Sequence, residues 1–223
     1  MSVKPGSKRV LVVAAHSDDE VLGVGGTITR HILCDDSVTV AIAADCRTAR
    51  PGHREPPALH PASIETSNIL GTTLRFLGFP GMSLADGPEL GLTCAVEAVI
   101  HEVKPDTVYT HHPSDPNSDH RAVAAAVMVA TRPIGPEAPR RVFCFETPSS
   151  TEWCWQPTFA PNFFVDVTAT FDKKLLAMAC FTAELRPPPH PRGIEALRAR
   201  AAYWGQVAGV TCAEPFVLVR GVW

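Results

Sequence analysis

The chain has 223 residues and a formal net charge of −3, with 45% hydrophobic and 19% charged residues. This apolar content excludes a wholly disordered chain, and no apolar run approaches the roughly 18 residues of a membrane-spanning helix. The near balance of charges excludes the dominant basic surface of a nucleic-acid-binding protein. We therefore expect neither a nucleic-acid partner nor a membrane span.

The N-terminal segment does not resemble a secretion signal. Its apolar run is short, lacks a small-residue cleavage pattern and leads directly into the acidic cluster Asp18–Glu20. The seven cysteines are irregularly spaced and form no CxxC pair, which favours reduced thiols. We therefore expect a cytoplasmic protein, and the length predicts one domain over residues 1–223.

Strands and helices are predicted to alternate along the chain. Short apolar runs rich in β-branched or aromatic residues predict strands at 9–15, 37–44, 74–79, 106–112, 141–146, 162–167 and 216–220. Helical patterns are expected at 21–33, 62–70, 87–103, 120–131, 169–185 and 193–207. This order is typical of an α/β fold with a mostly parallel sheet covered on both faces, a three-layer sandwich. Three glycines in the first helix, Gly23, Gly25 and Gly26, predict close packing against the sheet.

Two polar clusters follow predicted strands. His16–Glu20 comes directly after the strand at 9–15, and His111–His120 begins at the end of the strand at 106–112. In open α/β sheets, ligands bind beyond the carboxyl ends of the strands. We therefore expect the two clusters to converge at one edge of the sheet.

The residue types in these clusters suit a divalent metal. Catalytic zinc takes three His, Asp or Glu ligands and keeps one position open for water. His16 and Asp19 are three residues apart and His120 completes a His-Asp-His set, which also suits Fe(II). Asp18 stands beside the ligands, where a general base is required. The structural alternative is that the histidines form hydrogen bonds and the acidic residues cap a helix.

A family resemblance rests on three segments. AAHSDDEVLGVGGTITRH resembles the AHPDDExLGxGGxI signature of the PIG-L/LmbE-like deacetylases, and THHPSDPNSDHRAV resembles their HHPxDxNxDHRAV signature. Between them, IETSNILGTTLRFLGFPGMSL resembles the family's ExxxAxxxLGxxxxxLGxPDxxL stretch. The resemblance covers about residues 9–130 and implies a Rossmann-like domain with one zinc ion. It implies His16, Asp19 and His120 as zinc ligands and Asp18 as general base.

The resemblance also implies an activity. The family typically hydrolyses the N-acetyl group of an amino sugar or of a glycosylated natural-product intermediate, which releases acetate and a free amine. Some relatives cleave other amides. Trimers and hexamers occur among relatives, so the resemblance is compatible with a homo-oligomer.

The chain departs from the family pattern at several positions. Asn117 stands where many family deacetylases have a histidine that assists the oxyanion, which leaves His112 or His111 as candidates for that role. Gly81 replaces the Asp of the LGxPD stretch, and an Arg common before the helical Glu is missing near Ala62. These departures point to a substrate other than an ordinary N-acetylglucosamine conjugate. They leave open a non-hydrolytic step in natural-product biosynthesis, or metal binding without turnover.

Further residues have weaker signals. Asp115 and Asp119 are expected either to orient the metal-binding imidazoles or to form loop hydrogen bonds, and Glu20 to cap or orient. Basic residues of the long Pro-rich loop at 46–61 are expected either to line the substrate mouth or to be solvated: Arg47, Arg50, His53 and Arg54. Trp153 and Trp155 are expected either to stack on a sugar ring or to pack.

Overall fold

A computed structural model describes residues 7–45, 59–80, 84–85, 89–155 and 159–222. The strands are β1 (Arg9–Ala14), β2 (Ser37–Asp45), β3 (Thr73–Pro80), β4 (Thr107–His111), β5 (Arg141–Phe145), β6 (Phe163–Asp166) and β7 (Ala213–Gly221). The helices are α1 (Asp19–Leu33), α2 (Leu59–Leu70), α3 (Glu89–Val103), α4 (Ser118–Ala130), α5 (Phe171–Met178) and α6 (Ile194–Ala208), with a short 3-10 helix η1 (Thr151–Trp153).

All strands belong to one sheet with the order β3-β2-β1-β4-β5-β7-β6. The strands β3, β2, β1, β4 and β5 are parallel to one another, whereas β7 pairs antiparallel with β5 and β6 pairs antiparallel with β7 at one edge. The predicted α/β class with a mostly parallel sheet is therefore confirmed. The chain builds outward from β1 to β3 and then returns to place β4 on the other side of β1. Such a reversal opens a crevice at the carboxyl ends of the two strands, where ligands of α/β folds bind.

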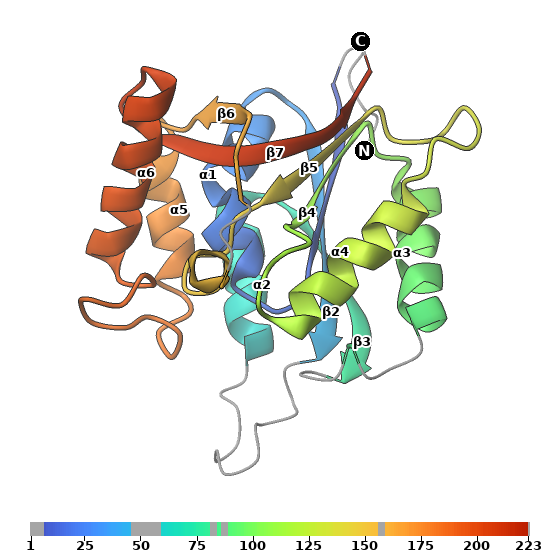
Figure 1. Ribbon diagram of the computed structural model, residues 1–223, viewed down its shortest axis with the longest axis horizontal. Helices are drawn as coiled ribbons and strands as arrows, with labels where there is room; N and C mark the ends of the chain where they lie inside the picture. Colours follow the sequence, from blue (N-terminus) through green and yellow to red (C-terminus); the bar gives the residue numbers. More distant parts are fainter. Residues whose placement is uncertain (1–6, 46–58, 81–83, 86–88, 156–158, 223) are drawn as a thin grey trace.

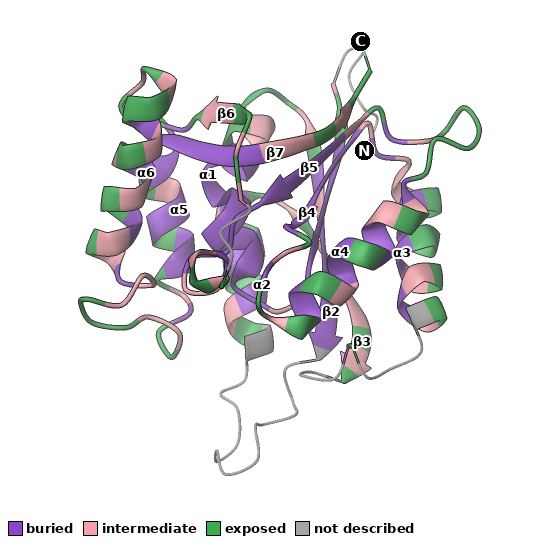
Figure 2. Cartoon of the chain, viewed as in Figure 1, coloured by how far each residue is buried: buried purple, intermediate pink, exposed green. Residues whose placement is uncertain are grey.

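Helices cover both faces of the sheet (Figure 1). On one face, Val10 and Val12 of β1 pack in a cluster with apolar residues of α1, α5 and α6. On the other face, Leu11 and Val13 pack with apolar residues of α3 and α4. Figure 2 shows the central strands as buried between these helical layers. Successive side chains of a strand point to opposite faces of the sheet. A strand that is buried on both faces therefore has a continuous apolar sequence.

Helix α1 lies close to the sheet because of its glycines. A Cβ atom at Gly23 would lie 2.3 Å from Cδ2 of Phe145, and one at Gly26 would lie 2.8 Å from Cγ1 of Val167. Neither neighbour leaves room for a methyl group. The prediction that these glycines permit close packing is confirmed, and the contact fixes the N-terminus of α1 at the crevice.

The C-terminal third differs from the sequence prediction in its boundaries. The helix expected over 169–185 ends at Met178, because the chain turns there and buries Phe181 in the core. The last strand begins at Ala213 rather than Phe216, since β7 pairs with β6 as well as with β5. Within the described ranges, no helix combines the length and apolar character needed to cross a membrane.

Candidate functional site

The two polar clusters meet at the carboxyl ends of β1 and β4. These strands are neighbours, with Val10 paired to Thr107 and Val12 to Tyr109. From β1 the chain passes through His16 into α1, and from β4 it passes through a short loop into α4. The convergence expected from the sequence is therefore present in the fold.

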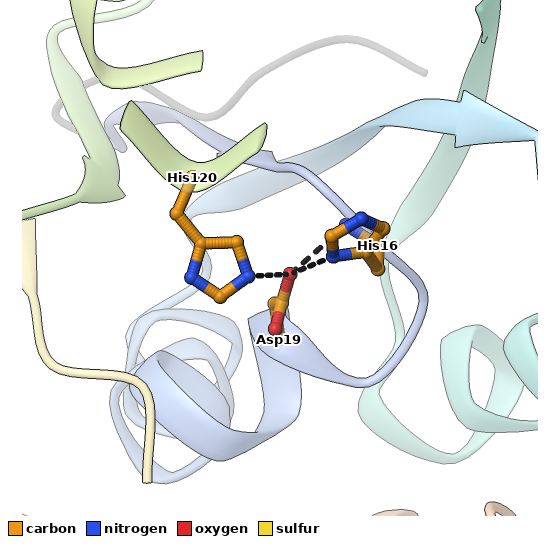
Figure 3. A group of neighbouring side chains, drawn as sticks. All are labelled: His16, Asp19 and His120. Atoms are coloured by element: carbon orange, nitrogen blue, oxygen red, sulfur yellow. Dashed lines mark hydrogen bonds and ion pairs between the residues drawn. The ribbon is translucent and has the colours of Figure 1, made fainter. Parts of the chain in front are cut away.

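Three side chains from the two clusters point at one another (Figure 3). Nδ1 of His16 lies 3.4 Å from Oδ2 of Asp19, and Nε2 of His120 lies 3.3 Å from the same oxygen. One potential ligand atom from each residue lies within 4.8 Å of the others. Asp19 and His120 are buried, whereas the His16 side chain is 23% exposed, so the group faces solvent on one side.

This spacing fits a divalent metal. Bonds of about 2.1 Å in a tetrahedral zinc site place neighbouring ligand atoms roughly 3.4 Å apart. The separations of 3.3 and 3.4 Å from the Asp19 oxygen to the two imidazoles agree with that value. Imidazole nitrogen and carboxylate oxygen are donors that both zinc and Fe(II) accept. The three predicted ligands thus form a suitable donor set, and Asp19 lies between the two imidazoles.

A second carboxylate holds each imidazole from behind. Oδ2 of Asp119 lies 3.0 Å from Nε2 of His16, and Oδ1 of Asp115 lies 3.2 Å from Nδ1 of His120. Each contact leaves the other ring nitrogen directed toward Asp19. Carboxylates in this position fix the tautomer and the ring orientation of metal-binding histidines. Asp115 and Asp119 thus contact the ring nitrogens that do not face Asp19.

Asp115 is itself held by hydroxyl groups from the segment after β5. Ser150 Oγ donates to Oδ1 of Asp115, and Thr151 Oγ1 donates to Oδ2 at 2.7 Å. The backbone N–H of Asn117 donates to Oδ1 at 2.9 Å. The sequence analysis missed Ser150 and Thr151, because single hydroxyl residues in a loop carry no spacing signal.

His111 also lies near Asp19 but has a different set of partners. Its Nε2 accepts the backbone N–H of Ala15 at 2.9 Å, and its Nδ1 lies 3.1 Å from Thr147 Oγ1. The ring stacks on His120 with centroids 4.0 Å apart and is fully buried. Both ring nitrogens are therefore engaged, and His111 supports His120 rather than facing a substrate.

The electrostatics of the group favour positive charge. Burial alone would lower the pKa of His16, but the carboxylates of Asp119 and Asp19 outweigh it and raise the pKa to about 10. Burial likewise opposes protonation of His120, yet Asp19 and Asp115 raise its pKa to about 9. Burial would raise the pKa of Asp19, but the neighbouring imidazoles of His120 and His111 hold it well below its usual range. A divalent cation between these groups would meet the same favourable field.

Asp18 is buried beside the three residues, but its carboxylate does not cap α1. Its backbone φ of 101° is unusual for a residue other than glycine, and such strained positions cluster at functional sites. Oδ2 of Asp18 accepts a hydrogen bond from Nη1 of Arg192 at 3.1 Å, and Arg192 also contacts Glu184. Burial, followed by the charge of Asp19, raises the pKa of Asp18 well above its usual range, and Arg192 opposes that rise.

The sequence analysis missed Arg192. Its Nη1 forms an ion pair with Asp18. Arg192 follows a proline-rich break in the C-terminal third, outside every recognisable motif. Oε2 of Glu20 accepts the backbone N–H of Asp18 at 3.0 Å. Burial raises the pKa of Glu20 to about 8.

His112 and Asn117 lie in the loop between β4 and α4. Oδ1 of Asn117 accepts the backbone N–H of Asp119 at 2.9 Å, so its side chain caps α4. Nδ1 of His112 lies 2.7 Å from Ser114 Oγ, and its ring meets the edge of Phe159 at 5.3 Å. Burial lowers the pKa of His112, with Asp115 opposing the change, so the neutral ring is favoured.

Two of the residues predicted to contact the substrate, Trp153 and Trp155, are exposed side chains. Trp153 in η1 is 58% exposed, and its ring meets that of His190 edge-on at 5.8 Å. Trp155 is 95% exposed. The basic residues of the long loop lie outside the described residues, namely Arg47, Arg50, His53 and Arg54.

Similarity to known proteins extends over nearly the whole chain. Among solved structures, the conserved protein TT1542 from Thermus thermophilus is 30% identical, with 97% of this chain and 96% of that chain covered at a TM-score of 0.78. The N,N'-diacetylchitobiose deacetylase from Pyrococcus horikoshii is 20% identical over 97% and 85%, also at 0.78. GalB, the 4-carboxy-2-hydroxymuconate hydratase from Pseudomonas putida, is 22% identical over 97% and 98%, at 0.72. The family model described as PIG-L, GlcNAc-PI de-N-acetylase, matches residues 11–131, which include both polar clusters, and the chain therefore belongs to the PIG-L family.

Proposed function

We propose that this protein is a metal-dependent N-deacetylase that hydrolyses an N-acetyl group on an amino sugar or a glycosylated small molecule. The observation that carries the proposal is the arrangement of His16, Asp19 and His120 around one point, with the buried carboxylate of Asp18 next to them. Zinc is the expected metal, and Fe(II) suits the same donors. Membership of a family described as a de-N-acetylase supports the reaction class.

The three residues would hold the metal while second carboxylates keep them in place. When bound, the metal would polarise the acyl carbonyl and acidify a water molecule. Asp119 and Asp115 lie 3.0 and 3.2 Å from the outer ring nitrogens and would keep His16 and His120 oriented. Arg192 and the backbone of α1 hold Asp18 in position at the helix N-terminus.

Asp18 acts as the general base in this proposal. Its carboxylate takes the proton of the attacking water and, once protonated, returns a proton to the leaving amine. Its burial and the neighbouring Asp19 make proton uptake favourable, which suits this double role. No capping bond has to break when the carboxylate accepts the proton.

His112 is our candidate for the donor that assists the developing oxyanion. Asn117 uses its side-chain oxygen as a helix cap, and His111 is fully buried with both nitrogens engaged. His112 remains as the candidate from this cluster; it is buried, and its ring meets that of Phe159 edge-on. A donor in this role stabilises the charge that forms on the substrate oxygen.

An amino-sugar substrate is supported by two features. Trp153 presents an exposed indole ring, which suits stacking on a sugar, and it contacts His190. The backbone N–H of Arg192 donates to Nδ1 of His190 at 3.1 Å, so Trp153 is connected to the segment that reaches Asp18. A neighbour with the same fold is a diacetylchitobiose deacetylase.

The test is acetate release from a panel of N-acetyl sugars, including N-acetylglucosamine, N,N'-diacetylchitobiose and N-acetylglucosaminyl conjugates. We expect turnover with at least one compound, and loss of about 10²-fold or more in Asp18→Asn with the metal retained. Turnover of Asp18→Asn at the parent rate would contradict the assignment of Asp18 as the general base. If the metal-loaded protein releases acetate from none of the compounds, the proposal that it is a deacetylase is wrong.

A second candidate is a non-hydrolytic step on the same scaffold. Asn117 replaces the histidine of many family deacetylases, and GalB shows that a hydratase shares this fold. Addition of water to a carbon–carbon double bond also needs a base such as Asp18. This candidate predicts loss of the ultraviolet absorbance of an unsaturated carboxylate without release of acetate.

A further inference from the structure

A cavity lies at the opposite end of the sheet from the metal ligands. It has a volume of about 460 Å³ and is bordered by the second half of α1 and by the first residues of β4 and β5, Thr107 and Arg141. The metal ligands instead follow the carboxyl ends of the parallel strands. The volume falls within the range of small-molecule sites in proteins.

Two of the lining threonines have a buried hydroxyl group without a partner among the described residues. Oγ1 of Thr27 and Oγ1 of Thr107 have no hydrogen bond within the described part of the chain, although both residues are only 1% exposed. Thr29, two residues further along α1, satisfies its hydroxyl on the carbonyl of Gly25. Leaving a buried polar group unpaired costs about 1–3 kcal/mol. A molecule in the cavity that bonds to these hydroxyls would account for them.

A fixed polar relay leads into the same cavity. Asp36 Oδ2 lies 2.7 Å from Nδ1 of His31, and Nε2 of His31 lies 3.1 Å from the hydroxyl of Tyr109. The carboxylate selects the tautomer with hydrogen on Nδ1, so Nε2 accepts the Tyr109 proton. The phenol hydrogen is used within the relay, which fixes the ring of Tyr109 on the cavity wall. Asp36 uses its other oxygen to accept the backbone N–H of Lys8 at 2.7 Å.

The charges and apolar groups of the wall define the kind of ligand. Lys8, Arg30 and Arg141 line the cavity with three positive charges against the single carboxylate of Asp36. The aromatic rings lie side by side on one wall: Tyr109 and Phe143 have centroids 5.1 Å apart at 15°, and Phe143 and Phe163 have centroids 4.9 Å apart. Cations beside aromatic rings suit an anion with a flat apolar body.

We propose that this cavity is a second binding site, separate from the metal centre, for a small aryl carboxylate. The carboxylate would lie toward the three cations and accept hydrogen bonds from Thr27 and Thr107, while the ring would lie against the aromatic wall. The site is independent of the proposed deacetylase reaction, since none of its lining residues belongs to the metal centre.

Cys34 gives a local readout of occupancy. It is exposed and lines the cavity, whereas Cys94 on α3 is exposed and lies outside it. Alkylation with iodoacetamide is followed at both cysteines by mass spectrometry, with phenylacetate or benzoate as the probe. At about 10 mM probe we expect Cys34 to react at least about fivefold more slowly, with Cys94 unchanged. Acetate and benzyl alcohol, which lack the ring or the charge, should protect less.

Variants distinguish the cavity from other anion sites. Thr107→Val is nearly isosteric, and Arg141→Met removes one cation, so each should weaken protection by about two- to tenfold. Arg198→Met, an exposed arginine of α6 outside the cavity, is the matched control and should leave protection unchanged. Equal protection in the parent and Thr107→Val, or none at Cys34 with either probe, would overturn the proposal.

Discussion

Nη1 of Arg192 lies 3.1 Å from Oδ2 of Asp18, although the two residues are 174 positions apart in the chain. The same guanidinium nitrogen lies 2.6 Å from Oε2 of Glu184. This contact brings the C-terminal third, which carries no family signature, to the centre of the site. Arg192 is a positioning residue in our account, because it acts by holding the proposed base.

Replacing Arg192 should impair turnover more than binding. In Arg192→Ala we expect kcat to fall by about ten- to a hundredfold with little change in KM, a part of the roughly 10²–10⁴ that general-base catalysis contributes. Metal content should stay at the parent level, since Arg192 does not contact the three ligands. Steady-state kinetics on the best substrate of the panel provide the measurement.

Arg192→Lys is the conservative control. It keeps the charge and should restore part of the lost kcat, whereas a purely structural role would leave the two variants equally stable and equally active. A parent-like kcat in Arg192→Ala would show that Asp18 does not depend on this contact.

Removing a carboxylate behind an imidazole should weaken metal binding. Asp115→Ala frees Nδ1 of His120, and Asp119→Ala frees Nε2 of His16. Each should lower zinc affinity by about 10- to 100-fold, the usual effect of losing such a partner. Competition with a chromophoric chelator measures the affinity. Asp172→Asn, at an exposed carboxylate on α5, is the control, and equal affinities in all three variants would contradict the orienting role.

The glycines of α1 should differ in their tolerance of a methyl group. Gly23→Ala and Gly26→Ala force contacts of 2.3 Å with Phe145 and 2.8 Å with Val167, so each should lower the free energy of unfolding by about 1–3 kcal/mol. Gly25→Ala meets Cγ of Lys174 at 3.0 Å, the longest of the three approaches, and should cost less. Urea denaturation followed by circular dichroism gives the ranking. The packing argument fails if Gly25→Ala is the most damaging.

The buried ion pair between α5 and β7 provides a further test of the core. Nζ of Lys174 lies 2.6 Å from Oε1 of Glu214 and 2.8 Å from the carbonyl of Leu22. Lys174→Met leaves the Glu214 charge buried and should lower the free energy of unfolding by about 3–5 kcal/mol. Lys173→Met, one position earlier and partly exposed, should change it little. Similar losses in both variants would contradict this interpretation.

The ends of the parallel strands were the most predictable part of the molecule. An uninterrupted apolar run such as residues 10–14 of β1 indicates a strand buried on both faces, and polar residues directly after it must lie at the carboxyl edge. His16, Asp19 and His120 could therefore be named as candidates from local patterns. Asp115 and Asp119 were named for the same reason, because they lie inside the second cluster.

The partners of these residues were not predictable, because they come from distant segments. Arg192 and Thr151 reach the site only through the path of the chain after β5, and no spacing rule links them to Asp18 or Asp115. The overlong helix prediction at 169–185 has a similar cause. The burial of Phe181 in the tertiary core, which a periodic pattern does not contain, ends α5 at Met178.

The metal content of the purified protein is the most direct test of the central claim, measured by elemental analysis without added metal or chelator. We predict about one zinc or iron per chain in the parent and in Asp18→Asn, and a large loss in His120→Ala. A parent protein that carries no metal and takes up none on titration with zinc would contradict the assignment of His16, Asp19 and His120. Equal metal content in the parent and His120→Ala would contradict it as well.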